Sequence, residues 1–354
     1  ETGMRRLVSA VAIAALLVAP VAAMAGTTLY GNARISLNYW DNDTGGDTNL
    51  SLNDNVSRLG VKGEYGDAIK GFFHLQVSAR VAPDSAMNVA VPGVDEMGNQ
   101  VSITGTTSND NDAFGQRFYF AGLKGSFGAL KYGRVTNAYK MPGFQQAGKL
   151  YDSTTLGVGG PISLGGAIYG QSPMNNGFHN VIEYFTPSMG GAKLSGSVAV
   201  DNSDANNHGY ILTASYDVGG INLGAAYADN GDGSQIPGLM AEGNAYRVYG
   251  NYKTDSMKFG LSYEGVEVAG VEDRVNYVMG IASMTVAAKT DLIASVGVVD
   301  AGPSEGVGGT VAVNYGITEK TEVMLSGSYG DLEAGPAPMA VSLLFVHNFS
   351  ISSN

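Results

Sequence analysis

Few residues of this chain could do chemistry, and they form no catalytic or metal-binding pattern. The sequence has no cysteine, so thiolate chemistry and disulfides are excluded. Asp41 to Asp47 resembles the first half of a calcium loop, but Leu52 stands where that loop needs a Glu, so an acidic external hairpin is the preferred interpretation. The four histidines have no metal-ligand spacing; they are His74, His179, His208 and His347. We therefore expect no catalytic residue, no metal and no cofactor.

Arginines that alternate with apolar residues carry a clearer signal. From Thr28 to Trp40, Arg34 falls on one face of a strand with Asn32, while Ile35 and Leu37 fall on the other, because successive side chains of a strand point to opposite faces. The same spacing places Arg58 on the polar face of its own segment. Such a two-faced strand fits either a soluble sandwich or a membrane barrel with a wet interior.

The hairpin from Gln116 to Arg134 poses the same question most sharply. Its first strand puts Phe118 and Phe120 on one parity and Arg117 and Tyr119 on the other. In a soluble sandwich the Phe face would be the core. In a membrane barrel we expect the Phe face to meet lipid and the Arg117 face to line a lumen.

The N-terminus indicates export. Met4, Arg5 and Arg6 precede an uncharged apolar run, and Ala23 to Ala25 forms a small-x-small cleavage site, which together predict a signal peptide over residues 4–25. Residues 1–3 precede this methionine, and we do not expect them to be part of the folded domain. We expect residues 26–354 to form one barrel domain.

Composition favours strands and excludes one class of partner. Charged residues are 15% of the chain, against about 25% in ordinary soluble domains, and the chain contains 51 Gly and 19 Tyr. Apolar residues are interleaved with polar ones, which is typical of short alternating strands. The net charge of −12 argues against a nucleic-acid partner. In sum, the pattern predicts an all-β fold of about sixteen strands, with tight turns at one end and longer polar loops at the other, as in an antiparallel outer-membrane barrel.

Three boundaries follow from the same pattern. We expect an acidic loop over residues 41–55, a long polar loop over 81–115 and a last strand over 338–349. Tyrosines near strand ends, among them Tyr30 and Tyr263, are expected in the outer aromatic girdles of such a barrel.

Four motifs then resemble, in order, the general diffusion porins of Gram-negative bacteria. They are Thr28 to Trp40 (TLYGNARISLNYW), Ser57 to Gly63 (SRLGVKG), Arg117 to Arg134 (RFYFAGLKGSFGALKYGR) and Glu183 to Gly191 (EYFTPSMGG). The resemblance implies a sixteen-stranded barrel, normally trimeric, set in outer-membrane lipid and lipopolysaccharide. It also implies passive diffusion of small hydrophilic solutes and ions, and a third loop that folds into the lumen and narrows it.

Residues 135–177 stand where that loop belongs. The segment is far longer than the roughly 12–15 residues of an ordinary loop, and too apolar for a disordered one. We expect it to pack on the inner barrel wall; a folded external cap is the alternative. The loop residues expected to form the constriction are Lys140, Pro142, Gly143, Phe144, Lys149 and Asp152.

The resemblance also assigns wall residues to the constriction. Arg58 and Arg117 correspond to the family's basic ladder, and Arg34 replaces a basic position of some relatives at Asn32. Many relatives carry a Glu in the loop turn facing this ladder, whereas this chain reads Gln145. A basic ladder without the facing acid predicts weak anion selectivity, although Glu183, inward by parity, opposes it.

Two other functions remain open from the sequence. A substrate-specific porin would need an aromatic track or a binding site in the lumen, which Tyr119, Tyr151 and Tyr169 are too few to form. A barrel that only anchors a surface adhesion or structural protein is compatible with the long polar loops. No motif marks an enzyme.

Overall fold

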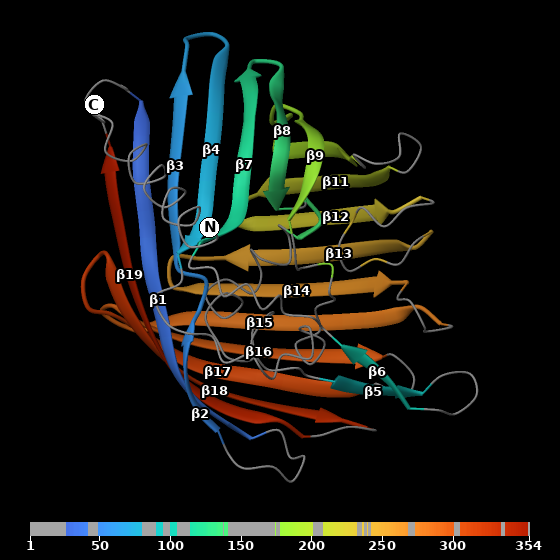
Figure 1. Ribbon diagram of the computed structural model, residues 1–354, viewed down its shortest axis with the longest axis vertical. Coiled ribbons are helices and arrows are strands. Elements are labelled where there is room, and N and C mark those ends of the chain that lie inside the picture. Colours follow the sequence, from blue (N-terminus) through green and yellow to red (C-terminus); the bar gives the residue numbers. More distant parts are fainter. Residues whose placement is uncertain are drawn as a thin grey trace, which may run out of the picture.

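In the computed structural model, the described residues lie almost wholly in strands and the turns between them (Figure 1). The described residues are 26–41, 49–79, 90–94, 100–104, 114–136, 138–140, 174, 178–200, 208–231, 236, 239, 242–267, 273–300, 305–333 and 337–352. Among them, no helix is long and apolar enough to span a membrane.

The strands follow one another with few interruptions. In the first half they are β1 (Thr27–Asp41), β2 (Asn49–Asp54), β3 (Arg58–Tyr65), β4 (Lys70–Ala79), β5 (Ala90–Val94), β6 (Gln100–Thr104), β7 (Phe114–Gly125), β8 (Gly128–Thr136), β9 (Phe178–Phe185) and β10 (Ala192–Ala199). In the second half they are β11 (Gly209–Val218), β12 (Ile221–Asp229), β13 (Asn244–Lys253), β14 (Met257–Val266), β15 (Val275–Ala287), β16 (Thr290–Asp300), β17 (Gly306–Gly316), β18 (Thr321–Leu332) and β19 (Met339–Ser352).

The main sheet closes on itself. Neighbouring strands of this sheet pair antiparallel, with β4 pairing directly with β7, and β19 pairs back onto β1 from Ser352↔Thr28 to Met339↔Asp41. Strands β2 and β3 pair with successive halves of β1 and form one interrupted strand, so the closed barrel has sixteen positions, as predicted. Closure leaves no sheet edge, which is how a barrel satisfies its backbone groups in lipid. Strands β5 and β6 form a separate hairpin.

The break between β2 and β3 has a local cause. Val56 has a φ of 67°, a left-handed conformation that a β-branched residue rarely adopts. Ser57 holds this turn, because its backbone N–H donates to Asp54 Oδ1 at 2.8 Å and its Oγ accepts from the Arg34 N–H at 2.9 Å. The interruption therefore fixes where β3 begins, with Arg58 as its first residue.

Tight turns join the strands at one end of the barrel. Between β11 and β12, Val218 pairs directly with Ile221, and Gly219 and Gly220 both have positive φ, 54° and 85°. Two successive positive φ values define the two-residue hairpin turn that matches strand twist, and glycine adopts them without strain. Long connections lie at the opposite ends of the same strands, as the sequence predicts.

The two faces of the barrel differ in chemistry. Along β19, Val341, Leu343 and Phe345 are exposed, and the alternating positions are buried. Large exposed apolar side chains recur in this way on β1, β4 and β7 to β19, whereas buried residues include Arg, Glu, Asn and Ser. A soluble protein would show the reverse partition. The outer face is thus apolar and the inner face carries the charged groups, which confirms the membrane-barrel alternative.

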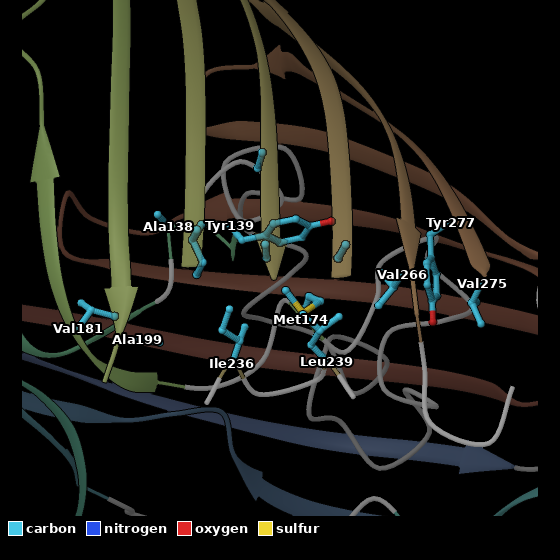
Figure 2. Packing of buried hydrophobic residues seen from close by; sticks show 14 of the residues in the cluster. Ala138, Tyr139, Met174, Val181, Ala199, Ile236, Leu239, Val266, Val275 and Tyr277 are labelled. Atoms are coloured by element: carbon cyan, nitrogen blue, oxygen red, sulfur yellow. The ribbon is translucent and has the colours of Figure 1, made fainter. Parts of the chain in front are cut away.

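The inner face is not uniformly polar. Inward side chains of β15 to β19 form one buried apolar cluster, which includes Met279, Met324 and Leu344. A second cluster joins inward residues of several strands to Tyr139, Met174, Ile236 and Leu239 from the connections (Figure 2). These connection residues need an apolar partner because their side chains are almost fully buried. The expectation of an interior lined only by polar groups is therefore too simple.

Three boundaries differ from the sequence prediction. Asn49–Asp54, predicted as part of an acidic loop, is strand β2, because it continues the pairing with β1. The long loop predicted over 81–115 contains the β5–β6 hairpin. The last strand does not end at Phe349 but continues to Ser352, since Ile351 pairs with Leu29.

Candidate pore lining

Three arginines lie on the inner wall, on β1, β3 and β7. Arg34 on β1 is buried, with 7% of its surface exposed. Arg58 on β3 pairs with Asn32, one inward position from Arg34, and its Nε donates to the Val56 carbonyl at 3.3 Å. On β7, the Arg117 Nε donates to Gln76 Oε1 at 2.8 Å. The three arginines that the sequence singled out thus lie on the inner wall within four successive strands, β1, β3, β4 and β7.

Arg117 faces inward for a reason that the sequence did not reveal. The pairing between β4 and β7 shifts between Gln76 and Val77, which pair with Phe118 and Gln116. This β-bulge inserts Arg117 as an extra residue and breaks the two-residue alternation. As a result Arg117 and Phe118 both turn toward the inner face.

The predicted orientation of the Phe residues is therefore wrong. Phe120 pairs with His74, which is on the inner face, whereas Tyr119 pairs with Leu75 and both are exposed outside, at 41% and 53%. Cross-strand partners share a face of the sheet. Phe118 and Phe120 line the interior, and Tyr119 meets the lipid side.

Tyr30 is a second residue whose position differs from the prediction. As a tyrosine near a strand end it was expected in the outer aromatic girdle. Instead its hydroxyl contacts His74 Nε2 and accepts a hydrogen bond from Gln76 Nε2 at 2.6 Å, inside the barrel. The ring lies across Gly60, where a Cβ would come within 2.6 Å of it. Glycine at position 60 makes the space for this inward ring.

The inner rings form one patch, which we call the aromatic patch: Tyr30, His74, Phe118 and Phe120. The His74 ring centroid lies 5.0 Å from that of Phe118 and 5.2 Å from that of Phe120, and the two Phe rings are 6.1 Å apart at 80°. These are the tilted and edge-to-face geometries that aromatic rings prefer. The aromatic patch lies next to the arginines, on the side nearer the end of the barrel where the tight turns are.

Positive charge is concentrated on the same part of the wall. The inner face of the five strands β3, β4, β7, β8 and β9 carries six basic and two acidic residues, in a chain whose net charge is −12. The basic residues are Arg58, Lys62, Lys70, Arg117, Lys124 and Lys131. Arg134 is not among them, because it pairs with Tyr119 and shares its outer face. The two acidic residues are Glu64 and Glu183. This excess of cations makes the local potential of the wall positive.

Glu183 lies inward on β9, as its parity predicted, and it has a basic partner. The Lys131 Nζ lies 2.6 Å from Glu183 Oε2, and the Glu183 side chain is almost fully buried. Lys131 was not singled out from the sequence, although its position on the polar parity of β8 was visible there. The positive charge of Lys131 offsets the negative charge of Glu183. Glu183 therefore does not neutralise the other basic residues of the wall.

The described residues after β8 are attached to the opposite wall. The Arg247 guanidinium on β13 donates through Nη1 to the Tyr139 carbonyl at 2.9 Å and through Nη2 to Glu264 Oε2 on β14 at 2.7 Å. Arg247 also lies over the Tyr139 ring, 4.8 Å from its centroid. Burial raises the pKa of Tyr139 well above its ordinary value, so the phenol stays neutral. No sequence signal identified this clamp, because its three members are far apart in the chain.

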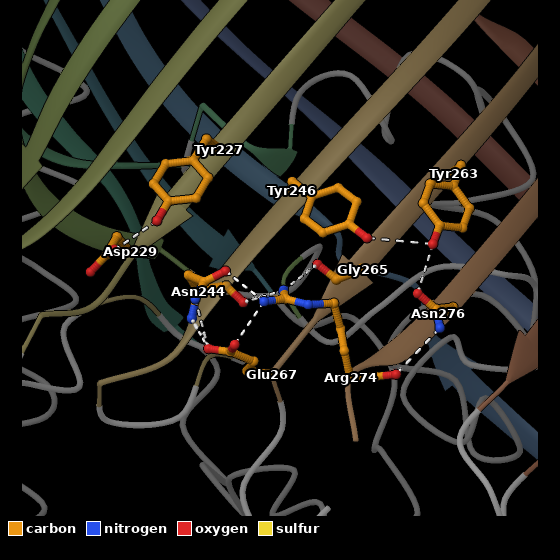
Figure 3. Close-up of polar contacts among 9 residues, drawn as sticks. All are labelled: Tyr227, Asp229, Asn244, Tyr246, Tyr263, Gly265, Glu267, Arg274 and Asn276. Carbon is orange, nitrogen blue, oxygen red and sulfur yellow. Dashed lines mark hydrogen bonds and ion pairs between the residues drawn. The ribbon is translucent and has the colours of Figure 1, made fainter. Parts of the chain in front are cut away.

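A second polar network lies where β13, β14 and β15 meet the long connections (Figure 3). Arg274 donates to Asn244 Oδ1 at 2.8 Å and to Glu267 Oε1 at 2.7 Å. Nearby, Tyr263 donates to Asn276 Oδ1 at 2.8 Å. Tyr263 is also exposed on the outer face, which fits its predicted place in an aromatic girdle.

Several predicted residues lie outside the described part of the chain. They are Pro142, Gly143, Phe144, Lys149 and Asp152 of the loop, and most of the acidic segment that begins at Asp41. Lys140 is described and half-buried, one residue after Tyr139.

A closed antiparallel barrel with an apolar outer face and charged inner groups defines an outer-membrane barrel protein. The model of the Gram-negative porin family matches residues 10–335. The chain therefore belongs to the Gram-negative porin family and forms a channel in the bacterial outer membrane.

Individual relatives are distant. The major outer membrane protein P.IB of Neisseria lactamica is 24% identical over 273 residues, which cover 72% of this chain and 68% of that protein. The anion-selective porin from Comamonas acidovorans matches with a TM-score of 0.67 and 19% identity, over 91% of this chain and 99% of that one. The trimer form of in-vitro folded OmpT of Vibrio cholerae matches with a TM-score of 0.61 and 14% identity, over 92% of this chain and 100% of that one.

Proposed function

We propose that this porin is a passive diffusion channel for small hydrophilic solutes and ions with a preference for anions, and that it catalyses no reaction. One observation carries the selectivity: six basic and two acidic residues on the inner face of β3, β4, β7, β8 and β9. Fixed charges that line a narrow water column attract counter-ions and repel co-ions. Arg34, Arg58 and Arg117 are the wall residues assigned to the constriction.

The opposing side of the constriction is assigned to the connection over residues 135–177. Its described members support an inward course, because Val135, Ala138, Tyr139 and Met174 are all buried in the cluster on the inner wall. The Arg247 clamp holds Tyr139 by its carbonyl and its ring. The proposal places Lys140, Pro142, Gly143, Phe144, Lys149 and Asp152 opposite the arginines.

Two further features follow from the family. The protein assembles as a homotrimer, an arrangement that the trimer form of OmpT of Vibrio cholerae supports, and its outer face contacts lipid and lipopolysaccharide. Migration of the unheated, detergent-folded protein on a native gel tests the trimer: a band at three times the mass of the heated chain is expected.

Bilayer electrophysiology tests the channel and its selectivity separately. Reconstituted protein should give discrete conductance steps, and the reversal potential in a KCl gradient should have the sign of chloride preference. Arg58→Gln together with Arg117→Gln should move the reversal potential toward potassium preference. Lys193→Gln is the matched control, since Lys193 lies on β10 outside the basic strands, and its side chain is half exposed.

The outcomes separate the alternatives. A barrel that only anchors a surface protein passes no solute in liposome swelling and gives no conductance steps. Clear potassium preference in the unmodified protein removes the anion proposal and leaves the channel intact.

A further inference from the structure

The aromatic patch is out of place in a water-filled lumen. Porin interiors are polar, and apolar residues belong on the lipid face. Yet His74, Phe118 and Phe120 lie on the inner face, and all three remain partly exposed rather than sealed by neighbours. Exposed apolar surface that is rimmed by polar groups commonly marks a binding site. The bulge at Arg117, which turns Phe118 inward, builds this surface.

Cations surround the patch on three sides. Lys131 Nζ lies 5.5 Å from the Phe120 ring centroid and 4.7 Å from that of Phe185. Lys62 Nζ lies 5.5 Å from the Tyr30 centroid, over the ring. On the third side Arg117 adjoins Phe118 and reaches Tyr30 through Gln76, which bonds both. An apolar surface made of aromatic rings thus lies within reach of several positively charged side chains.

We propose that this surface is a saturable binding site for aromatic carboxylates, so that the channel transports them selectively among the small anions it admits. The proposal deepens, and rests on, the function proposed above. The ligand ring packs face to face on one of Phe118 and Phe120 and edge to face against the other, because these two rings stand at 80° to each other. Its carboxylate meets the positive charge of Arg117 and its neighbours. The ring contact adds to the affinity that any small anion gains from the basic wall.

The chemistry excludes other ligand classes. An aromatic cation would share the ring contact but meet a wall with excess positive charge. A neutral aromatic alcohol would lack the ionic contact, and a saturated carboxylate would lack the stacking. Benzoate, benzyl alcohol and cyclohexanecarboxylate therefore form a set that isolates each contribution.

Titration of single channels with these three compounds tests the proposal. In the unmodified protein, added benzoate should reduce the chloride current to a plateau, and the other two should need roughly tenfold higher concentrations. Phe118→Leu with Phe120→Leu should weaken the benzoate effect by roughly tenfold while the KCl conductance persists. Tyr119→Leu, on the same strand but facing outward, should leave it unchanged.

A second measurement keeps the site testable if no conductance is found. The fluorine NMR line of 4-fluorobenzoate should broaden with the detergent-folded protein, and excess benzoate should sharpen it again. Equal effects of benzoate and cyclohexanecarboxylate, or an unchanged benzoate effect in the Phe double variant, would overturn the site. Absence of KCl conductance with intact 4-fluorobenzoate binding would overturn only the channel, whereas normal conductance without binding would overturn only the site.

Discussion

The buried clamp at Arg247 allows a quantitative test of how the barrel interior is stabilised. Arg247 and Glu264 lie 2.7 Å apart with 1% and 2% of their side chains exposed. Replacing Arg247 with Met leaves a buried carboxylate without its cation and removes the donor to the Tyr139 carbonyl. Loss of one partner of a buried pair costs about 3–5 kcal/mol. We expect the free energy of unfolding to fall by that amount.

The double variant distinguishes a lost pair from a lost side chain. Arg247→Met with Glu264→Leu removes both charges, and a well-packed apolar pair in their place is often neutral. We expect the double variant to lose less free energy of unfolding than the two single variants together, by at least about 2 kcal/mol. Urea unfolding of the protein refolded in phospholipid vesicles measures each value.

Lys193→Met is the control for this cycle. Lys193 and Asp217 lie 3.6 Å apart with 55% and 49% of their side chains exposed, and water screens such a pair. Its loss should cost less than about 1 kcal/mol. The reasoning fails if the Arg247 and Lys193 variants lose similar stability, or if the two single effects at the clamp simply add.

Three further experiments test other parts of the fold by the same unfolding measurement. Val296→Arg on the outer face of β16 should lower the free energy of unfolding in vesicles by about 2–4 kcal/mol, because it exposes a charge to lipid. Ser295→Arg on the inner face should lower it clearly less. Equal losses would contradict the assigned faces. Gly220→Ala should cost more than about 1 kcal/mol of stability, because φ is 85° and a Cβ would lie 2.6 Å from the Lys253 carbonyl oxygen. Gly219→Asn should be nearly neutral, because a Cβ at position 219 would meet open space. Val56→Asn should stabilise by up to about 1 kcal/mol, since Asn tolerates a φ of 67° better than Val; a loss would show that Val56 makes contacts worth more than its strain.

Much of the strand order could be read from the sequence. Alternation of apolar and polar residues and the Gly-rich turns gave the sixteen barrel positions, because both signals are local and repeat every two residues. Arg34 and Glu183 were placed on the inner face correctly for the same reason. The interrupted strand at Val56 was missed, since a single residue with positive φ has no pattern that predicts it.

Side-chain orientation on β7 needed the tertiary structure. A strict period of two predicts that Phe118 and Phe120 face lipid. The extra residue opposite β4 turns both rings inward instead. Only the register between β4 and β7 reveals this bulge. The clamp that joins Tyr139 to Arg247 and Glu264 was equally hidden, because its members come from one connection and two distant strands. Local chemistry along the chain thus determined that this protein is a barrel with an oily outside. Contacts between distant segments decided which rings and charges meet inside it.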